Sequence, residues 1–124
     1  SLENTVHLYT QTREQIRTSL SRVSERCQID ADGQKRVLFY GAGDVAEIAY
    51  ISLQSTDLAL VGVVDDRCTG RFFDVEICHS DRLSETTLGS VPYAHVVVTS
   101  VRHAETILAR LDERAVLRSH VSCL

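Results

Sequence analysis

The sequence lacks methionine and contains one lysine, Lys35, among thirteen basic residues. A single lysine excludes a G-K-[ST] phosphate loop, a Tyr-x-x-x-Lys dehydrogenase pair and a Schiff-base lysine in a cleft. A chain of 124 residues that starts at Ser1 without any methionine indicates a module cut from a longer protein, or one processed at its start. The length is enough for one domain with a real core, but too short for a full two-half dinucleotide fold plus a catalytic domain.

Long apolar runs, cysteine pairs and excess positive charge are missing as well. No transmembrane run, signal peptide or lipidation motif is visible, so we expect no membrane partner. The net charge of −4 gives no electrostatic footprint for DNA binding by this segment itself. The cysteines form no C-x-x-C motif, which predicts reduced thiols, a cytoplasmic location and no metal site. They are Cys27, Cys68, Cys78 and Cys123.

The most informative segment is a glycine turn between an apolar strand pattern at 35–40 and a helical pattern that follows it. The turn matches G-x-G-x-x-A, a phosphate-binding pattern that joins a strand to a helix. In this pattern Gly41 permits the tight turn, Gly43 lets the backbone approach a phosphate, and Ala46 lets the helix pack on the strand. The turn therefore predicts a nucleotide-binding strand-helix unit.

A second apolar run at 58–64 ends in Asp65 and Asp66, about 24 residues after Gly41. Carboxylates at this spacing bind ribose hydroxyls in dinucleotide folds, although they can also simply solvate a strand end. Arg67 or Arg71 could pair with an additional phosphate. The predicted ligand-binding residues are Gly41, Ala42, Gly43, Asp44, Val45, Asp65, Asp66, Arg67, Arg71, Thr99 and Ser100.

A long helix is predicted over about residues 4–28, and its apolar positions form an a/d heptad seam interrupted by Arg13. The seam consists of Val6, Tyr9, Ile16, Leu20, Val23 and Cys27. The seam could lie on its own domain or pair with a second copy, and the strict periodicity favours a homodimer. We therefore expect a linker or dimerisation helix at 1–30 and a nucleotide-binding domain at 35–124.

Strand patterns at 35–40, 58–64, 75–78, 94–100 and 115–117 alternate with helical patterns, including a weak one at 81–88 and another at 101–114. Continuous apolar strands predict a parallel sheet covered on both faces. The expected fold is therefore α/β: a small Rossmann-like, doubly wound parallel sheet of about five strands in the order 3-2-1-4-5. This order brings residues 41–45, 65–67 and 99–102 to one crevice.

The motifs V-L-F-Y-G-A-G-D-V-A-E, V-G-V-V-D-D and V-V-V-T-S occur in that order over residues 35–121. This run resembles the CoA-binding-like Rossmann modules of nucleotide-sugar dehydratases and of redox-sensing repressors. With the preceding helix, the chain is most similar to the C-terminal domain of bacterial MarR-like, winged helix-turn-helix regulators associated with exopolysaccharides. The resemblance implies a cytoplasmic regulator that binds DNA only through an upstream domain missing from this chain.

Three functions follow from these patterns. The first is a regulatory domain that senses NAD(H), a nucleotide-sugar or a CoA derivative. The alternative is the nucleotide-binding fragment of a nucleotide-sugar modifying oxidoreductase or dehydratase, but the candidate proton-transfer groups lack partners at useful spacing. These groups are His79, His95, Ser100 and His103. A third is a fold that only dimerises. Asp44 and Glu47, in the first helical turn, stabilise the start of the helix, but they would repel a phosphate unless their side chains point away. The identity of the ligand, NAD or another, therefore stays open.

Overall fold

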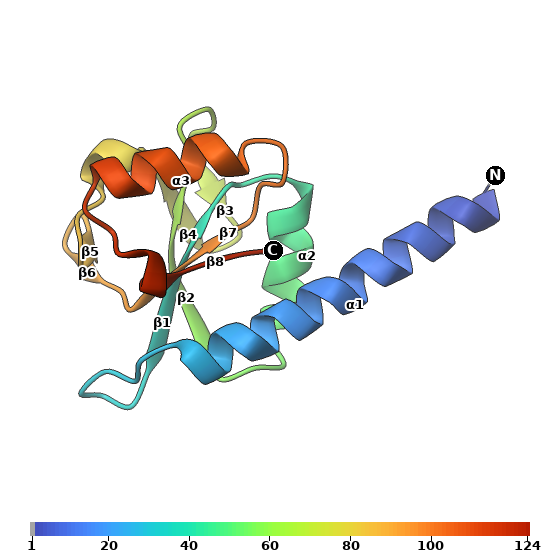
Figure 1. Cartoon of the computed structure of the whole chain (residues 1–124), viewed down its shortest axis with the longest axis horizontal. Helices are drawn as coiled ribbons and strands as arrows, with labels where there is room; N and C mark the ends of the chain where they lie inside the picture. The colour runs from blue at the N-terminus through green and yellow to red at the C-terminus, as the bar shows by residue number, and fades with distance from the viewer. Residues whose placement is uncertain (1) are drawn as a thin grey trace.

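The computed structural model describes the backbone of residues 2–124 and the side chains of residues 13–124. Over these residues the chain is mixed α/β, with three α-helices, a mostly parallel six-stranded sheet and a two-stranded hairpin (Figure 1). The elements are α1 (Leu2–Arg26), β1 (Lys35–Tyr40), α2 (Asp44–Leu53), β2 (Leu58–Val64), β3 (Arg71–Phe72), β4 (Val75–Cys78), β5 (Thr87–Leu88), β6 (Val91–Pro92), β7 (His95–Val98), α3 (Ala104–Glu113) and β8 (Val121–Cys123).

The sheet differs from the prediction in its strand count and therefore in its order. Its strands run β3-β4-β2-β1-β7-β8, six in place of the expected five among the described residues. The extra strand is β3, which pairs antiparallel with β4 across a two-residue turn where Phe73 has a φ of 52°. Aromatic contacts hold this edge in place, because the Tyr50 ring of α2 stacks on Phe73 at 4.2 Å and meets Phe72 edge-on.

Two further predictions for the second half of the chain were wrong. The last strand lies at 121–123 and not at 115–117, because α3 ends beside Ala115 with a φ of 62°, and a short 3₁₀ turn follows at 118–120. The weak helix at 81–88 is instead a 3₁₀ turn at 80–82 and the β5–β6 hairpin. The hairpin fits over the sheet because Gly62 has no side chain: a Cβ there would lie 2.7 Å from Leu88 Cδ2.

Helices cover both faces of the sheet (Figure 1). The alternation of side chains along each strand produces this arrangement, because successive residues point to opposite faces. In β7, Val97 joins the core under α1 and α2, while Val96 and Val98 join the core under α3. The alternation divides β1 in the same way, with Phe39 on the first side and Leu38 on the second. The expectation of a sheet covered on both faces is confirmed.

The second half of α1 packs on its own domain. Ile16, Leu20, Val23 and Cys27 are buried in one core cluster with residues of α2 and the sheet. Lys35 fixes the helix end, since its Nζ donates to the Ser24 carbonyl at 2.7 Å and pairs with the Asp57 carboxylate at 2.7 Å.

Val6 and Tyr9, the other predicted seam residues, lie outside the described side chains. The backbone of this half of α1 projects past the rest of the chain (Figure 1). From Ile16 onward, the seam therefore packs on its own domain. Pairing of the helix with a second copy stays a prediction.

Candidate functional site

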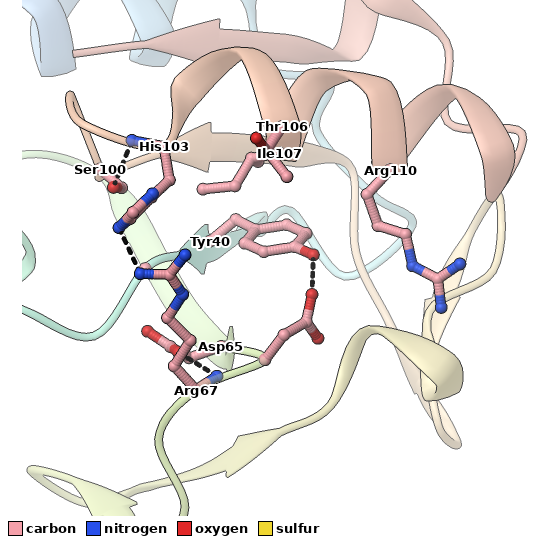
Figure 2. Close-up of a pocket in the computed structure, with 10 residues that line it drawn as sticks. Tyr40, Asp65, Arg67, Ser100, His103, Thr106, Ile107 and Arg110 are labelled. Carbon is pink, nitrogen blue, oxygen red and sulfur yellow. Dashed lines mark hydrogen bonds between the residues drawn. The ribbon is translucent and has the colours of Figure 1, made fainter.

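The carboxyl ends of β1, β2 and β7 open on one cleft of about 490 Å³. Its walls come from the three segments that the topology was expected to bring together, at 41–45, 65–67 and 99–102, without Asp66 and with Cys68 and His103 added. A smaller pocket of about 180 Å³ adjoins it under α3 and shares several of its walls (Figure 2). The predicted residues that line the larger cleft are Gly41, Ala42, Gly43, Asp44, Val45, Asp65, Arg67, Thr99 and Ser100.

Two predicted residues lie elsewhere. Asp66 lines only the smaller pocket. Arg71 lines neither of the two, because it belongs to β3 at the edge of the sheet and donates to the Asp74 carbonyl at 2.7 Å within its own hairpin turn. The sequence suggests Arg71 as a partner for an additional phosphate, because the β3–β4 hairpin that carries it to the sheet edge is not visible in the sequence.

The two glycines of the turn have different structural roles. Gly41 has a φ of 125°, and a Cβ on it would lie 2.8 Å from Thr99 Oγ1, so both its conformation and its neighbour require glycine. Thr99 reinforces this junction because its hydroxyl lies within 2.8 Å of the Gly41 carbonyl. Gly43 has ordinary backbone angles, and a Cβ on it would meet nothing within 4 Å. Gly43 therefore keeps open the space in front of the N-terminus of α2.

Asp65 organises the loops of the cleft. One carboxylate oxygen accepts hydrogen bonds from the amides of Arg67 at 2.8 Å and Cys68 at 3.0 Å. The other accepts from the Ala42 amide at 2.9 Å, which ties the glycine turn to the end of β2. Three backbone bonds thus occupy the carboxylate that was expected to bind ribose hydroxyls, and one amide of the glycine turn already has a partner.

Asp66 is also committed to neighbouring groups. It accepts from the Tyr40 hydroxyl at 2.6 Å and from the Ser80 amide at 2.9 Å, and His79 Nε2 lies 3.4 Å away. Partial burial opposes ionisation of this carboxyl, but the Tyr40, Ser80 and His79 contacts outweigh it and hold its pKa below the usual value. Burial and the bond to Asp66 raise the pKa of Tyr40, which stays a neutral donor.

Arg67 reaches across the cleft to α3. Its guanidinium donates to His103 Nε2 at 2.6 Å, so this ring nitrogen is the acceptor of the contact (Figure 2). Arg102 also lines the larger cleft. Among the described side chains, neither Arg67 nor Arg102 forms an ion pair with a carboxylate. The cleft therefore presents two guanidinium groups that are not held in ion pairs.

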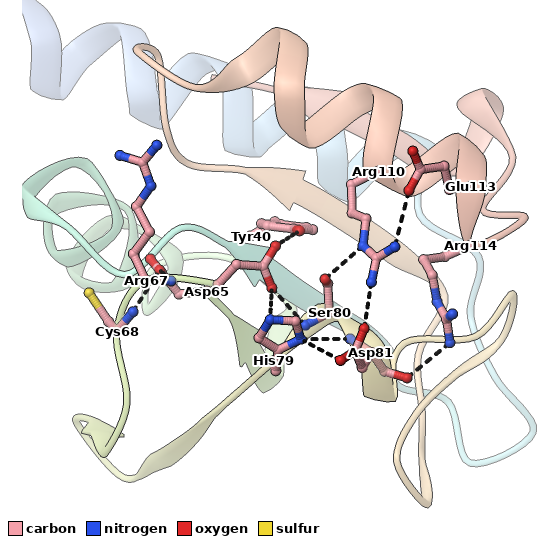
Figure 3. A network of polar contacts seen from close by, with 11 residues as sticks. Tyr40, Asp65, Arg67, Cys68, His79, Ser80, Asp81, Arg110, Glu113 and Arg114 are labelled. Atoms are coloured by element: carbon pink, nitrogen blue, oxygen red, sulfur yellow. Dashed lines mark hydrogen bonds and ion pairs between the residues drawn. The ribbon is translucent and has the colours of Figure 1, made fainter.

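The start and first turns of α3 contribute residues that the sequence did not assign to ligand binding; of these, only His103 was a candidate, for proton transfer. His103, Thr106, Ile107 and Arg110 line the smaller pocket, and their spacing of three and four places them on one helical face, a signal that was available. Arg110 is held in position by bonds to Ser80 Oγ at 2.9 Å, Asp81 at 2.6 Å and Glu113 at 3.0 Å (Figure 3). Its charge is thus balanced by two carboxylates, unlike the charge of Arg67.

The cleft holds no hydrolytic or metal-binding constellation within the described part of the chain. Ser100 Oγ accepts from the His103 backbone amide at 3.3 Å, and no serine or cysteine side chain of the cleft is bonded to a histidine ring. Residues 13–124 contain no cluster of metal-ligating side chains. In the same part of the chain, no helix has the length and apolar character needed to cross a bilayer.

Comparisons with known proteins found no matching family model, no matching curated protein and no matching solved structure. The fold class, mixed α/β with a mostly parallel sheet, therefore follows from the structure of this chain itself.

Proposed function

We propose that this chain is a Rossmann-like regulatory domain that binds a nucleotide-type ligand in the cleft of about 490 Å³. The observation that carries the proposal is that three strand ends, a glycine turn and unpaired arginines meet in this one cleft. In doubly wound sheets, ligands bind outside the carboxyl ends of the strands, where the order of the strands reverses. NAD(H), a nucleotide-sugar and a CoA derivative all carry the phosphates that such a cleft accepts.

The N-terminus of α2 supplies the phosphate site. Backbone amides at the start of a helix point outward, and the helix dipole favours an anion there. Ala42 already donates to Asp65, so the amides of Gly43, Asp44 and Val45 are left for the ligand. The Asp44 carboxylate lines the cleft and repels a phosphate. Arg102, which lines the same cleft, offsets this repulsion.

The same helix connects the ligand site to α1. The α2 residues Ala49 and Leu53 lie in one core cluster with Leu20 and Val23 of α1. A ligand at the start of α2 therefore contacts the element against which α1 rests. Occupancy would bias the orientation of α1 and, in a homodimer, that of DNA-binding domains preceding this segment in a transcriptional regulator.

Titration calorimetry with NAD⁺, NADH, NADP⁺, CoA, dephospho-CoA and a UDP-sugar tests the proposal. We expect one of these ligands to bind with one-to-one stoichiometry, and Gly43→Ala to weaken it about tenfold or more by filling the space that faces the phosphate. The free variant should unfold within about 1 kcal/mol of the parent, because its new methyl meets no protein atom. Absence of heat with every ligand would refute nucleotide binding.

A further inference from the structure

Most acceptor sites of the two carboxylates at the end of β2 are taken by the protein. A ribose with free 2′- and 3′-hydroxyls is usually bound by an acid at this position, which accepts from both hydroxyls. Here both oxygens of Asp65 accept from the loop amides of Ala42, Arg67 and Cys68. Both oxygens of Asp66 are likewise taken, by Tyr40 and Ser80. His79 Nε2, 3.4 Å from Asp66, is the third contact of that acid. A carboxylate has about four acceptor sites, so neither acid has the two that a ribose diol requires.

The same strand end instead presents a cation. Arg67 directly follows the two acids, and its side chain is exposed at the border between the two pockets. Among the described residues, its guanidinium makes one hydrogen bond, to His103 Nε2. A guanidinium has five N–H donors, so most remain for a ligand, and its flat fork matches the oxygens of a phosphate.

His103 is a positioning residue for this guanidinium. The imidazole stands at the start of α3 and accepts one Arg67 N–H, which holds the arginine across the cleft instead of leaving it free in solvent (Figure 2). Holding the guanidinium in place lowers the conformational entropy that it would lose on binding an anion.

We infer that the cleft selects a nucleotide whose ribose carries an additional phosphate monoester, bound by Arg67 at the end of β2. This inference rests on the proposed function and narrows its ligand class. Two sources of the same chemistry exist: a 2′-phosphate, as in NADP⁺, and a 3′-phosphate, as in CoA. An arginine near this strand end is the general solution for binding such a phosphate.

Matched ligand pairs test the inference by calorimetry on the full chain: NADP⁺ against NAD⁺, and CoA against dephospho-CoA. Within one pair, we expect the phosphorylated member to bind about tenfold more tightly or better, as a charge-assisted contact requires. The pair that shows the preference identifies the position of the phosphate. Arg67→Gln should bring the ratio of the two affinities close to one.

Further variants distinguish a specific contact between Arg67 and the phosphate from a general effect of positive charge on affinity. Arg17→Gln removes the same charge from the exposed face of α1 and should keep the ratio of the parent. His103→Asn, which keeps a hydrogen-bond acceptor, should retain most of the preference, whereas His103→Leu should lower it. Equal affinities within both pairs would overturn the inference and leave the proposed function standing. Binding by none of the four ligands or the UDP-sugar would overturn both.

Discussion

At the scale of single residues, the cleft depends on side chains that serve the backbone more than on side chains left free for a ligand. Asp65 joins the glycine turn to the loop after β2 through three backbone amides. Thr99 fills the space beside Gly41, where even a methyl group would collide with it. The groups that remain for a ligand are the amides of Gly43, Asp44 and Val45 and the guanidinium groups of Arg67 and Arg102.

His95 is a buried residue with a measurable effect on stability. It is 1 % exposed, and its Nε2 lies 2.8 Å from Ser122 Oγ. Burial, with smaller effects from Arg26 and His120, lowers its pKa from 6.5 to about 4. The unfolded chain therefore binds this proton more tightly than the folded chain. Stability from this group is complete above the unfolded value and is lost as the pH falls from about 6.5 to about 4.

We predict that protonation of His95 lowers the free energy of unfolding by up to about 3 kcal/mol when the pH reaches about 4. Urea unfolding of the parent and of His95→Gln between pH 7 and pH 4 measures the difference, because glutamine can bond Ser122 without titrating. The stability of the parent should fall more steeply than that of the variant. Parallel curves for the two proteins would show that His95 is not responsible.

At the scale of elements, α2 has two roles, because its first turn borders the cleft and its buried face supports α1. The second half of α1 is consequently part of the domain core. Leu20 is fully buried there, and Lys35 with Asp57 fixes the end of the helix beside β1 and β2.

Leu20→Ala should therefore destabilise the chain by about 2–5 kcal/mol, the cost of a cavity in a packed core. Arg17→Ala, on the exposed face of the same helix, should change stability by no more than about 0.5 kcal/mol. Chemical unfolding at several protein concentrations measures both. A helix that served only to join two copies would give a loss for Leu20→Ala that disappears on dilution.

The sequence predicted the elements whose signal is local and missed those decided by distant contacts. The glycine turn and the apolar runs of β1, β2 and β7 carry their own patterns, so the cleft could be located in advance. The β5–β6 hairpin depends on the absence of a side chain at Gly62, far away in sequence. In a sequence, an acid that binds ribose after a strand cannot be distinguished from one that binds backbone amides. The role of Asp65 is therefore visible only in the structure.

The heptad seam shows a similar limit. Its periodicity predicted a buried stripe on α1, and the stripe from Ile16 to Cys27 is indeed buried. The heptad periodicity does not show which surface buries the stripe, because a partner helix and a neighbouring helix of the same chain present equally apolar surfaces.

At the scale of the whole molecule, the parts form a path from the cleft through α2 to a helix whose first half extends past the domain (Figure 1). A ligand can shift the orientation of such a helix only if it binds two arrangements with different affinity. The first requirement of the account is therefore that a nucleotide binds in this cleft and not elsewhere on the chain.

The most direct test is a ¹⁵N NMR titration of the full chain with NADP⁺ and with CoA. The account predicts that one of them shifts backbone amides in the three segments lining the cleft, at 42–45, 65–68 and 99–103, with smaller shifts along α2. An unchanged spectrum at millimolar concentrations of both ligands, and likewise of NAD⁺ and a UDP-sugar, would contradict nucleotide binding. Shifts confined to other surfaces, such as the exposed face of α1, would contradict the proposed site.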